Sequence, residues 1–428
     1  MYEELLSILK AEVKPALGCT GPTSVSYAAS VAKDAVGGKV KTVKVLVDRD
    51  TYKNSIAVGI PGTTEMGVDI AAALGAVGGD SKLGLEVLNN ITSEDEKEAK
   101  RMLADGDLKL DIKWDIKAVG LYIEVFVETD KGVGHAIVAK THTNVVLIEA
   151  NDKVIYKDKA EDLETILDET KAPINNYGVK DFFEFASNVA IEEIEFLKEA
   201  VRLNKKLAEA GLEQKLGKGF GSAFTRFNQE QNAYMKAKAY TAAASDARMA
   251  GENLSAMACA SSGNVGITAT VPLYVIATEY EKSEEMLLRS LSLSYLLTIY
   301  IKNQIGRLSA MCACAIAASV GVGAGTVLML GGNFEQAQET IKNIVGSIGG
   351  VVCDGAKLGC ALKLSSAIGI AIESAYLAMD GVSIPAGDGI VCATADETLQ
   401  MLGRIARFGM IETDIIMCKE IINREQSK

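Results

Sequence analysis

The sequence predicts an α+β protein with two domains. A mixed α/β domain with antiparallel strands is expected over residues 1–170, followed by a larger all-helical domain over residues 171–428. Two observations lead to this prediction. Between Leu108 and Tyr156 the chain consists of β-like segments separated by turns, whereas beyond Asp158 it is rich in alanine and follows a helical period. The length of 428 residues also exceeds the roughly 150 residues of one ordinary domain.

The N-terminal segment predicts two helices and a strand. The amphipathic pattern of residues 2–13 indicates a short helix that stops near Pro15. A second helix is expected from Pro22 to Val36, where two glycines follow. The segment "KTVKVLVD" alternates with the period of a strand, and "GIPGTTEMG" has the glycine and proline content of a turn.

Further helices are expected on either side of the strands. The capping-box pattern "SEDE" opens a polar helix from Ser93 to about Leu103. One long helix is expected from Asp181 to Ala210, with a second capping box at its start and Gly211 at its end. Between these two helices, an antiparallel meander is predicted by the segments "LDIKWDIK", "GLYIEVFVETD", "GHAIVAK" and "NVVLIEAN".

Charge and composition exclude several classes of protein. The formal net charge of −12 argues against a nucleic-acid surface, which requires clustered Lys and Arg. The first residues, "MYEELLSILKAEV", lack the apolar core of a signal peptide, so we expect a cytoplasmic protein. Because disulfides are rare in that compartment, the eight cysteines are expected to be free thiols, metal ligands or catalytic groups. The sequence does not determine the oligomeric state, and a homo-oligomer is one of the states it allows.

Two long stretches carry no charge, Asn253–Thr278 and Leu308–Phe334. Both exceed the roughly 20 residues that span a bilayer. However, Gly, Ala, Ser, Cys and Thr dominate them, and aromatic belts are missing. We therefore expect tightly packed core helices and no membrane partner, with a membrane transporter as the competing interpretation.

Three cysteines could share a cofactor. Cys312, Cys353 and Cys360 form the pattern C-x40-C-x6-C, which lacks the paired spacing of zinc knuckles and of ferredoxins. Three thiolates would leave one iron of a [4Fe–4S] cube without a protein sulfur, as an open Lewis acid. Glycines around the last two cysteines would let the chain curl toward one cluster. On spacing alone, buried structural thiols remain the alternative.

Several motifs together resemble one family. "LGCTGP", "YKN…VGIPGT", "HTN", "SSGNVGIT", "GRLSAMC" and "CDGAKLGCALK" occur in the order found in the L-cysteine desulfidase family, from about Val13 to Asp414. Those enzymes are related to the iron–sulfur type of bacterial L-serine dehydratase. The resemblance implies that L-cysteine and water are converted to sulfide, ammonia and pyruvate. It also implies an oxygen-sensitive [4Fe–4S] cluster and no pyridoxal phosphate.

The resemblance also assigns residues. Cys312, Cys353 and Cys360 would be the cluster ligands, and Cys19 would face the open iron as proton acceptor or cap the cluster when substrate is absent. Gly21 departs from the "GCTEP" that relatives often have, which puts any role of an acidic group there in doubt.

Residue chemistry gives Cys19 independent support. A cysteine base must be partly ionised, and a helix that starts near Pro22 would place Cys19 at the positive end of the helix dipole, where its pKa should fall. A cysteine that is simply buried at the start of a helix is the alternative.

Six further residues are expected to bind the substrate. The backbone and side chains of the "SSGNVGIT" loop could hold the carboxylate, with a structural turn as the alternative. His142 is expected to line the site, although strand histidines usually make structural hydrogen bonds. Lys53 and Asn54 could contact the carboxylate or amino group, although a solvated loop lysine is the commoner case. The expected substrate contacts are Ser261, Ser262, Asn264, Lys53, Asn54 and His142.

Other charged and thiol groups are not expected at the site. Arg248 is expected to be a packing or surface residue, and Cys259, Cys314, Cys392 and Cys418 to be inert. The leading function is therefore a cytoplasmic L-cysteine desulfidase. An L-serine dehydratase of the iron–sulfur type differs from it only in the leaving group. A non-catalytic iron–sulfur redox or sensor protein, which should have four protein ligands, is the alternative from another class.

Overall fold

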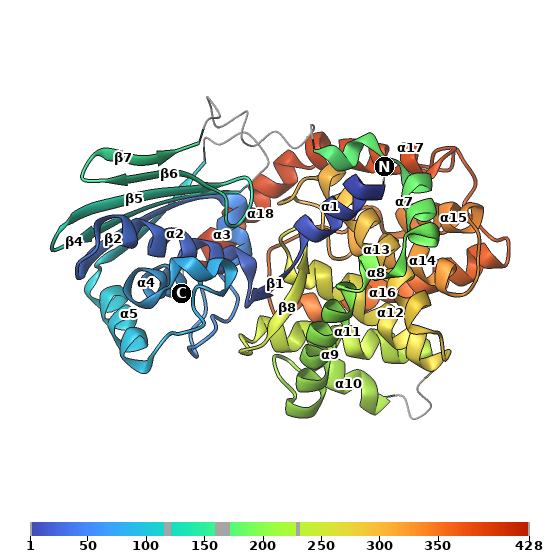
Figure 1. The fold of residues 1–428 in the computed structure, drawn as a ribbon, viewed down its shortest axis with the longest axis horizontal. Helices are drawn as coiled ribbons and strands as arrows, with labels where there is room; N and C mark the ends of the chain where they lie inside the picture. Colours follow the sequence, from blue (N-terminus) through green and yellow to red (C-terminus); the bar gives the residue numbers. More distant parts are fainter. Residues whose placement is uncertain (1, 115–120, 159–171, 228–231, 427–428) are drawn as a thin grey trace.

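The computed structural model describes residues 2–114, 121–158, 172–227 and 232–426. Two bodies lie side by side in Figure 1, one built around a sheet and the other made almost entirely of helices. The predicted α+β class is therefore confirmed. The N-terminus lies at the helical body, whereas the C-terminus lies at the sheet.

The α/β body holds a six-stranded sheet in the order β3-β2-β4-β5-β6-β7. Helix α2 packs across β4, β5 and β6, and α4 packs against α2 and β2 (Figure 1). The elements of this body are α2 (Thr20–Val36), β2 (Val40–Asp48), α3 (Arg49–Ser55), α4 (Val68–Gly78), η1 (Ser81–Glu86), α5 (Ser93–Asp105), β3 (Leu108–Lys113), β4 (Tyr122–Thr129), β5 (Gly132–Ala139), β6 (Val145–Ala150) and β7 (Lys153–Lys157).

Period-two alternation explains the core under this sheet. Val43, Val45 and Val47 of β2 and Val125 and Val127 of β4 are fully or almost fully buried and share one core cluster with α2. Their neighbours in the strands are more exposed. Burial of this stripe is the main force that holds α2 on the sheet.

The predicted meander is confirmed for β4 to β7, which pair antiparallel in sequence order. The first predicted segment behaves differently, because β3 pairs parallel to β2. Parallel neighbours need a long crossover, and α3, α4 and α5 supply it. The end of that predicted segment, residues 115–117, lies outside the described residues.

The helical body packs around one large apolar core. The elements not yet given are α1 (Tyr2–Glu12), β1 (Val13–Leu17), η2 (Pro173–Asn176), α7 (Val179–Asn188), α8 (Ile191–Ile194), α9 (Leu197–Gln214), α10 (Phe220–Phe227), α11 (Ala233–Met249), β8 (Ser255–Cys259), α12 (Gly263–Glu279), α13 (Glu284–Ile305), α14 (Ala317–Met329), α15 (Phe334–Ile348), α16 (Cys360–Met379), α17 (Ala395–Arg404), the π-helical turn Ile405–Gly409 and α18 (Ile411–Gln426).

The chain ends cross between the bodies. Leu5 and Leu9 of α1 are fully buried in the helical core, and β1 pairs antiparallel with β8. At the other end, α18 reaches across to contact α3 (Figure 1). The two bodies therefore do not follow the simple order predicted, and the predicted boundary near residue 170 lies outside the described residues. Strand β8 is also an exception to the prediction that strands cease after Asp158.

Three predicted helix details are wrong. The helix expected from Asp181 to Ala210 is divided into α7, α8 and α9. The chain becomes extended at Val189 and Ala190, which separates α7 from α8, and a turn at Glu195 and Phe196 separates α8 from α9. Gly211 lies inside α9 rather than at its end, where it permits a close crossing with α11. The first capping box starts one residue earlier than predicted, at Thr92 with Asp95. Asp181 is not an N-cap but the third residue of α7, where its carboxylate accepts a hydrogen bond from the amide of Gly178 at 2.9 Å.

The uncharged stretches form core helices, as expected. Nearly every residue of α12 and α14 is buried. Within the described part of the chain, α16 alone is long and apolar enough to cross a membrane by length and composition, and most of it is covered by neighbouring helices. Buried core helices pass the same test, so α16 gives little support for a membrane span.

We expect Gly75→Ala to destabilise the protein. Helices α2 and α4 cross closely there, and an added Cβ would lie 2.2 Å from the carbonyl oxygen of Ser26. Overpacking against backbone costs about 1–3 kcal/mol, measurable as a lower free energy of unfolding in urea. Gly350→Ala is the matched control, because its added Cβ meets no atom within 4 Å. Equal stability of the two variants would contradict this account of the crossing.

Candidate active site between the two bodies

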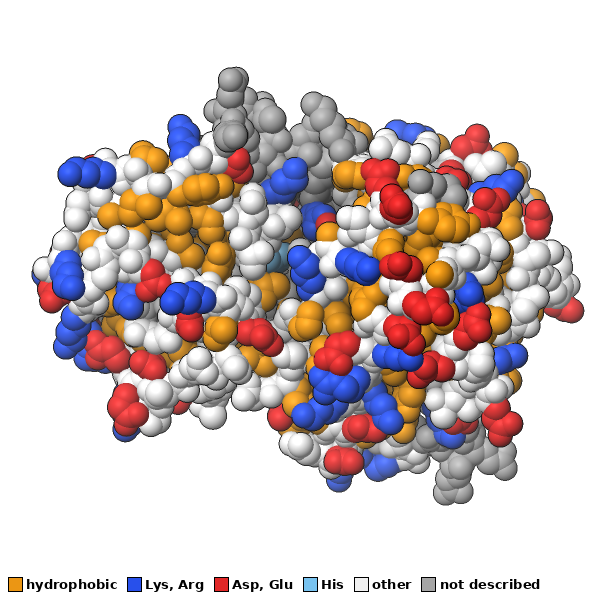
Figure 2. All heavy atoms as spheres, in the orientation of Figure 1, with side chains coloured by type: hydrophobic (Ala, Val, Ile, Leu, Met, Phe, Trp, Pro, Cys, Tyr) orange, Lys and Arg blue, Asp and Glu red, His pale blue; other side chains and the backbone are white. Residues whose placement is uncertain are grey.

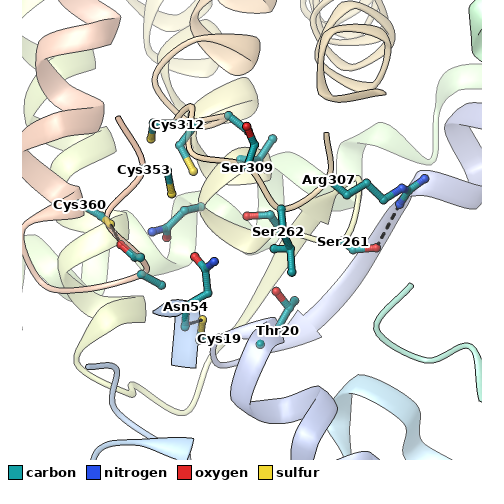
Figure 3. A pocket seen from close by; sticks show the side chains of 18 of the residues that line it. Cys19, Thr20, Asn54, Ser261, Ser262, Arg307, Ser309, Cys312, Cys353 and Cys360 are labelled. Carbon is teal, nitrogen blue, oxygen red and sulfur yellow. Dashed lines mark hydrogen bonds between the residues drawn. The ribbon is translucent and has the colours of Figure 1, made fainter. Parts of the chain in front are cut away.

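A cavity of about 810 Å³, counting the part that opens to solvent, lies where the two bodies meet. The α/β body contributes residues of α2 and α3, and the helical body contributes loops that precede α12, α14 and α16. Of the predicted site residues, those that line it are Cys19, Asn54, His142, Ser261, Ser262, Asn264, Cys312, Cys353 and Cys360. Figure 3 shows the last three sulfurs along one side of the pocket, with Cys19 across from them.

Backbone hydrogen bonds bring two of the cysteines together. Met311 and Val352 form an antiparallel bridge, the amide of Cys312 donates to Val351 O at 2.9 Å, and that of Cys353 donates to Ala310 O at 2.6 Å. Cys360 begins α16 after a loop that turns at Gly355, whose φ of +91° favours glycine. The predicted curling of this loop is consistent with that turn.

The thiols of these three cysteines are poorly ionised by themselves. Hydrogen bonding to Cys314, with burial, raises the pKa of Cys312 to about 12. Hydrogen bonding to Cys312, with burial, raises the pKa of Cys353 well above its ordinary value, and burial raises the pKa of Cys360. A cation among them would be needed to hold them as thiolates. Soft thiolates are the ligands that iron–sulfur clusters use.

Their spacing fits a cluster better than a single ion. Among the described residues, the one group of three acidic or thiol side chains whose ligand atoms all lie within 4.8 Å of one another is Asp50, Asp414 and Cys418. At least one pair of the three cavity sulfurs is therefore farther apart than 4.8 Å, which is wider than two ligands of one zinc ion, with Zn–S bonds of about 2.3 Å. Wider spacing suits ligands that bind different irons, so the residues present fit an iron–sulfur cluster.

Cys19 is the N-cap residue of α2, which begins at Thr20. Cys19 was predicted to lie just before this helix. Its side chain is 5% exposed, and its thiol lies 3.8 Å from the carbonyl oxygen of Asn54. Gly18 before it has a φ of +67° and packs against Pro61 of the predicted turn. These contacts fix the thiol at the cavity wall and exclude most of the bulk water.

The packing of α2 on α3 gives a physical reason for Gly21. An added Cβ at this position would lie 2.8 Å from Ser55 Oγ and 3.4 Å from the carbonyl oxygen of Asn54. A larger side chain at this position, such as glutamate, would therefore require α3 to move. The same close approach brings Asn54 against Cys19.

Four cations line the cavity, and sequence reasoning missed the role of three of them, Arg248, Lys302 and Arg307; the fourth is Lys363. Arg248 Nη2 donates to Gly18 O at 2.8 Å, and Lys302 Nζ donates to Ala260 O at 2.5 Å. Arg307 forms a two-pronged ion pair with Glu12. With Glu12 as the counter-ion, the cavity has an excess of positive charge that suits a carboxylate. The overlooked clue was a lone lysine in the apolar run "YLLTIYIKNQI" of α13.

The "SSGNVGIT" loop links β8 to α12. Ala260 and Ser261 have φ values of 46° and 64°, a conformation that side chains rarely adopt, and Ser262 is the N-cap of α12. Asn264 accepts a hydrogen bond from Arg248 Nη1 at 3.1 Å. The loop thus presents backbone N–H groups of a helix start and two serine side chains to the same cavity as the cations.

His142 is buried, with 7% of its surface exposed, and its Nδ1 has no hydrogen-bond partner. Burial, helped by the charges of Lys302, Arg307 and Arg248, lowers its pKa to about 3. The imidazole is therefore neutral at physiological pH, with a nitrogen available for a hydrogen bond to a ligand.

Lys53 is not among the described residues that line the cavity. Its ammonium group is fully buried and pairs with Asp414 of α18 at 2.5 Å and with Asp50 at 2.9 Å. Burial would lower the pKa of Lys53, but the nearby Asp50 and Cys353 raise it well above its ordinary value. The lysine is thus neither a solvated loop residue nor a cavity-wall group, and it supports the Cys353 loop from behind. Asn54, one residue later, does line the cavity.

Cys314 is a further departure from expectation. It lines the cavity beside Cys312, rather than lying apart as an inert thiol. It packs against the apolar cluster that contains Cys19 and Cys360 and against the cluster that contains Cys312. Cys418 packs near α3, outside the cavity, and its thiol lies 3.9 Å from Arg49 O.

The pKa values of the two histidines are shifted in opposite directions from the ordinary value of 6.5. Although burial opposes it, hydrogen bonds to Glu124 and Glu149 raise the pKa of His135 above 6.5, whereas that of His142 falls to about 3. Between pH 6.5 and about 3 the unfolded chain binds a proton at His142 that the folded chain does not, so this residue's contribution to stability is lost as pH falls. NMR of ¹⁵N-labelled histidine should show two signals, one still neutral at pH 5. Protonation of both at pH 5 would contradict the burial of His142.

Lys53→Met should be strongly destabilising. The change leaves two buried carboxylates without their partner, which costs about 3–5 kcal/mol of unfolding free energy, measurable by chemical denaturation. Lys100→Met is the control, since Lys100 pairs with Glu65 and Glu96 at the surface and its loss should matter far less. A similar loss of unfolding free energy in both variants would show that the buried ion pairs of Lys53 do not stabilise the contact between α3 and α18.

Comparison with known proteins places the chain in a family. Residues 82–419 match the family described as serine dehydratase alpha chain. A UPF0597 protein of Clostridium tetani is 40% identical over 420 residues, covering 98% of both chains. UPF0597 proteins of Caldanaerobacter subterraneus subsp. tengcongensis and Phocaeicola vulgatus are 41% and 37% identical over 421 and 417 residues, covering 95% or more of each chain. The chain therefore belongs to the serine dehydratase alpha chain family, related to the iron–sulfur serine dehydratases as its motifs predicted.

Proposed function

We propose that this protein is an L-cysteine desulfidase that uses a [4Fe–4S] cluster and no pyridoxal phosphate. Its family indicates a lyase-type enzyme. The observation that carries the proposal is the convergence of Cys19, four further cysteines and four cations on one cavity. The reaction converts L-cysteine and water to pyruvate, ammonia and hydrogen sulfide. We place it in the cytoplasm, where free thiols persist.

In the proposed site, Cys312, Cys353 and Cys360 hold the cluster. When bound, such a cluster supplies a Lewis-acidic iron with an open position, which can accept a soft leaving group. The cations and the "SSGNVGIT" loop bind the substrate carboxylate on the other side of the cavity. Because the cavity is largely buried, these charges act in a medium of low dielectric constant and orient the substrate strongly.

Cys19 takes the Cα proton. Its thiolate removes this proton while the C–S bond breaks and sulfide leaves, so the electron pair of the C–H bond becomes the new C=C bond. The resulting enamine tautomerises to an imine, and water hydrolyses the imine to pyruvate and ammonia. Cys19 is the N-cap residue of α2, so its thiol lies at the start of this helix. Neutral His142 can accept a hydrogen bond from the substrate ammonium group.

L-Serine dehydration is the second candidate, favoured by the description of the matched family. It uses the same base and the same carboxylate contacts, and water replaces sulfide as the leaving group. L-Cysteine is placed first because its sulfur is a softer donor toward iron than the hydroxyl oxygen of L-serine.

Anaerobically purified protein tests the proposal directly. We expect four irons per chain, acid-labile sulfide, and release of sulfide and pyruvate from L-cysteine at a higher kcat/KM than pyruvate from L-serine. The opposite preference would establish the dehydratase. Bound cluster without turnover of either substrate would leave the redox or sensor role, and absence of iron would refute the proposal.

Three variants separate the roles of the cysteines. Cys353→Ala should lose both iron and turnover, since it removes a proposed ligand. Cys19→Ala should keep its iron but lose at least about 100-fold in kcat, the typical contribution of a positioned base. Cys392→Ala, at a site away from the cavity, should keep both. Full activity in Cys19→Ala would show that another group takes the proton.

A further inference from the structure

A second cavity, of about 510 Å³ with its open part included, adjoins the first. The two share His142, Ser261 and Arg307, so these residues form the wall between them. Lys14 and Glu12 line the second cavity and not the first. On the face shown in Figure 2, Lys and Arg side chains border the junction of the two bodies.

The wall is closed by an ion pair. Glu12 ends α1, and its backbone carbonyl accepts a hydrogen bond from the amide of Ala260 at 2.9 Å. Its carboxylate binds Arg307, with Nη1 at 3.1 Å and Nη2 at 2.5 Å. Arg307 Nη1 also lies 3.4 Å from Ser261 Oγ, an interaction drawn in Figure 3. The guanidinium of Arg307 is therefore held by Glu12, which lines only the second cavity, and by Ser261, which lines both cavities.

The geometry is that of carboxylate recognition. A two-pronged pair between arginine and carboxylate is a strong and directional contact, and any small carboxylate could take the place of the Glu12 side chain. Farther in, Lys302 and Arg248 carry two more positive charges toward which such an anion is drawn. At the same wall, the buried Nδ1 of His142 has no partner, which marks a place where a polar ligand group would be accommodated.

We propose that the second cavity is the entrance for the substrate and that the Glu12–Arg307 ion pair is its gate. In the free protein the Glu12 carboxylate occupies the position at Arg307 that the carboxylate of an entering amino acid takes. The amino acid displaces Glu12, is held by Arg307 and passes to Lys302 and Arg248. This inference rests on the proposed function for the identity of the substrate, but the gate itself requires only a small carboxylate.

Calorimetric binding to anaerobically purified full-length protein tests the gate. L-Alanine and pyruvate serve as probes, because neither carries a group that could be eliminated. Glu12→Gln removes the competing charge, so both probes should bind about ten-fold more tightly, equivalent to about 1.4 kcal/mol. Arg307→Met should weaken both at least ten-fold. Arg307→Lys, which keeps the charge and offers a second chance of a folded variant, should fall in between.

The outcomes are distinct. Tighter binding of pyruvate alone to Glu12→Gln would keep the gate and count against an amino-acid substrate, and therefore against the proposed function. Weaker or unchanged binding of both probes to that variant would overturn the gate. Weaker binding of L-alanine alone would instead assign Glu12 to the substrate ammonium group, and would overturn the gate as well.

A blocked entrance gives a second test. Thr143 is exposed and lines the second cavity but not the first, so Thr143→Trp should fill the entrance without changing the inner site. Alkylation of Cys19 by iodoacetate, followed by mass spectrometry, should slow at least five-fold. Lys82→Trp, at an exposed residue that lines neither cavity, is the matched control. If Cys19 is alkylated at the same rate in Thr143→Trp and Lys82→Trp, or is alkylated in neither variant, the second cavity is not the route to Cys19.

Discussion

The pairing of β1 with β8 is the contact on which the cavity depends. β1 directly follows α1, whose Leu5 and Leu9 are buried in the helical body, and it precedes Cys19 and α2 of the α/β body. Its antiparallel ladder with β8 therefore ties the two bodies together at the point where their functional residues meet. Arg248 reinforces this contact, because it donates to Gly18 O from one side and to Asn264 from the other. A few main-chain and guanidinium hydrogen bonds thus position the start of α2, with Cys19 at its N-cap, against the "SSGNVGIT" loop.

At the far end of the chain, α18 makes the second crossing. Asp414 reaches the buried Lys53, which stands behind the loop of Cys353. Such a buried ionic joint is costly to form and costly to break, so it specifies one arrangement rather than adding much net stability. The two crossings hold the cavity walls from opposite sides. The proposed base and the proposed cluster ligands come from different bodies, and a fixed arrangement of those bodies is what elimination chemistry requires.

The fold class and most of the local elements could be predicted because they depend on local pattern. Period-two alternation in β2 and β4 and the glycines after α2 act over a few residues, and the chain follows them. Two of the errors share one physical cause, which is contact between distant segments. The parallel pairing of β3 depends on where α3 to α5 pack, and Gly211 is a crossing point because α11 lies against it. Neither neighbour is visible in the local sequence.

The sequence by itself determined which residues could carry the chemistry. Its ordered motifs indicated Cys19, the three later cysteines and the serine-rich loop, because reactive groups are chemically distinctive wherever they lie. Only the tertiary structure decided which charged groups join them. Lys302 and Arg307 look like ordinary helix and loop cations until burial places them at the cavity, and Lys53 looks like a ligand contact until Asp414, 361 residues away, takes its charge. Solvation and partnership decide the role of a charge, and both are set by packing over long sequence distances.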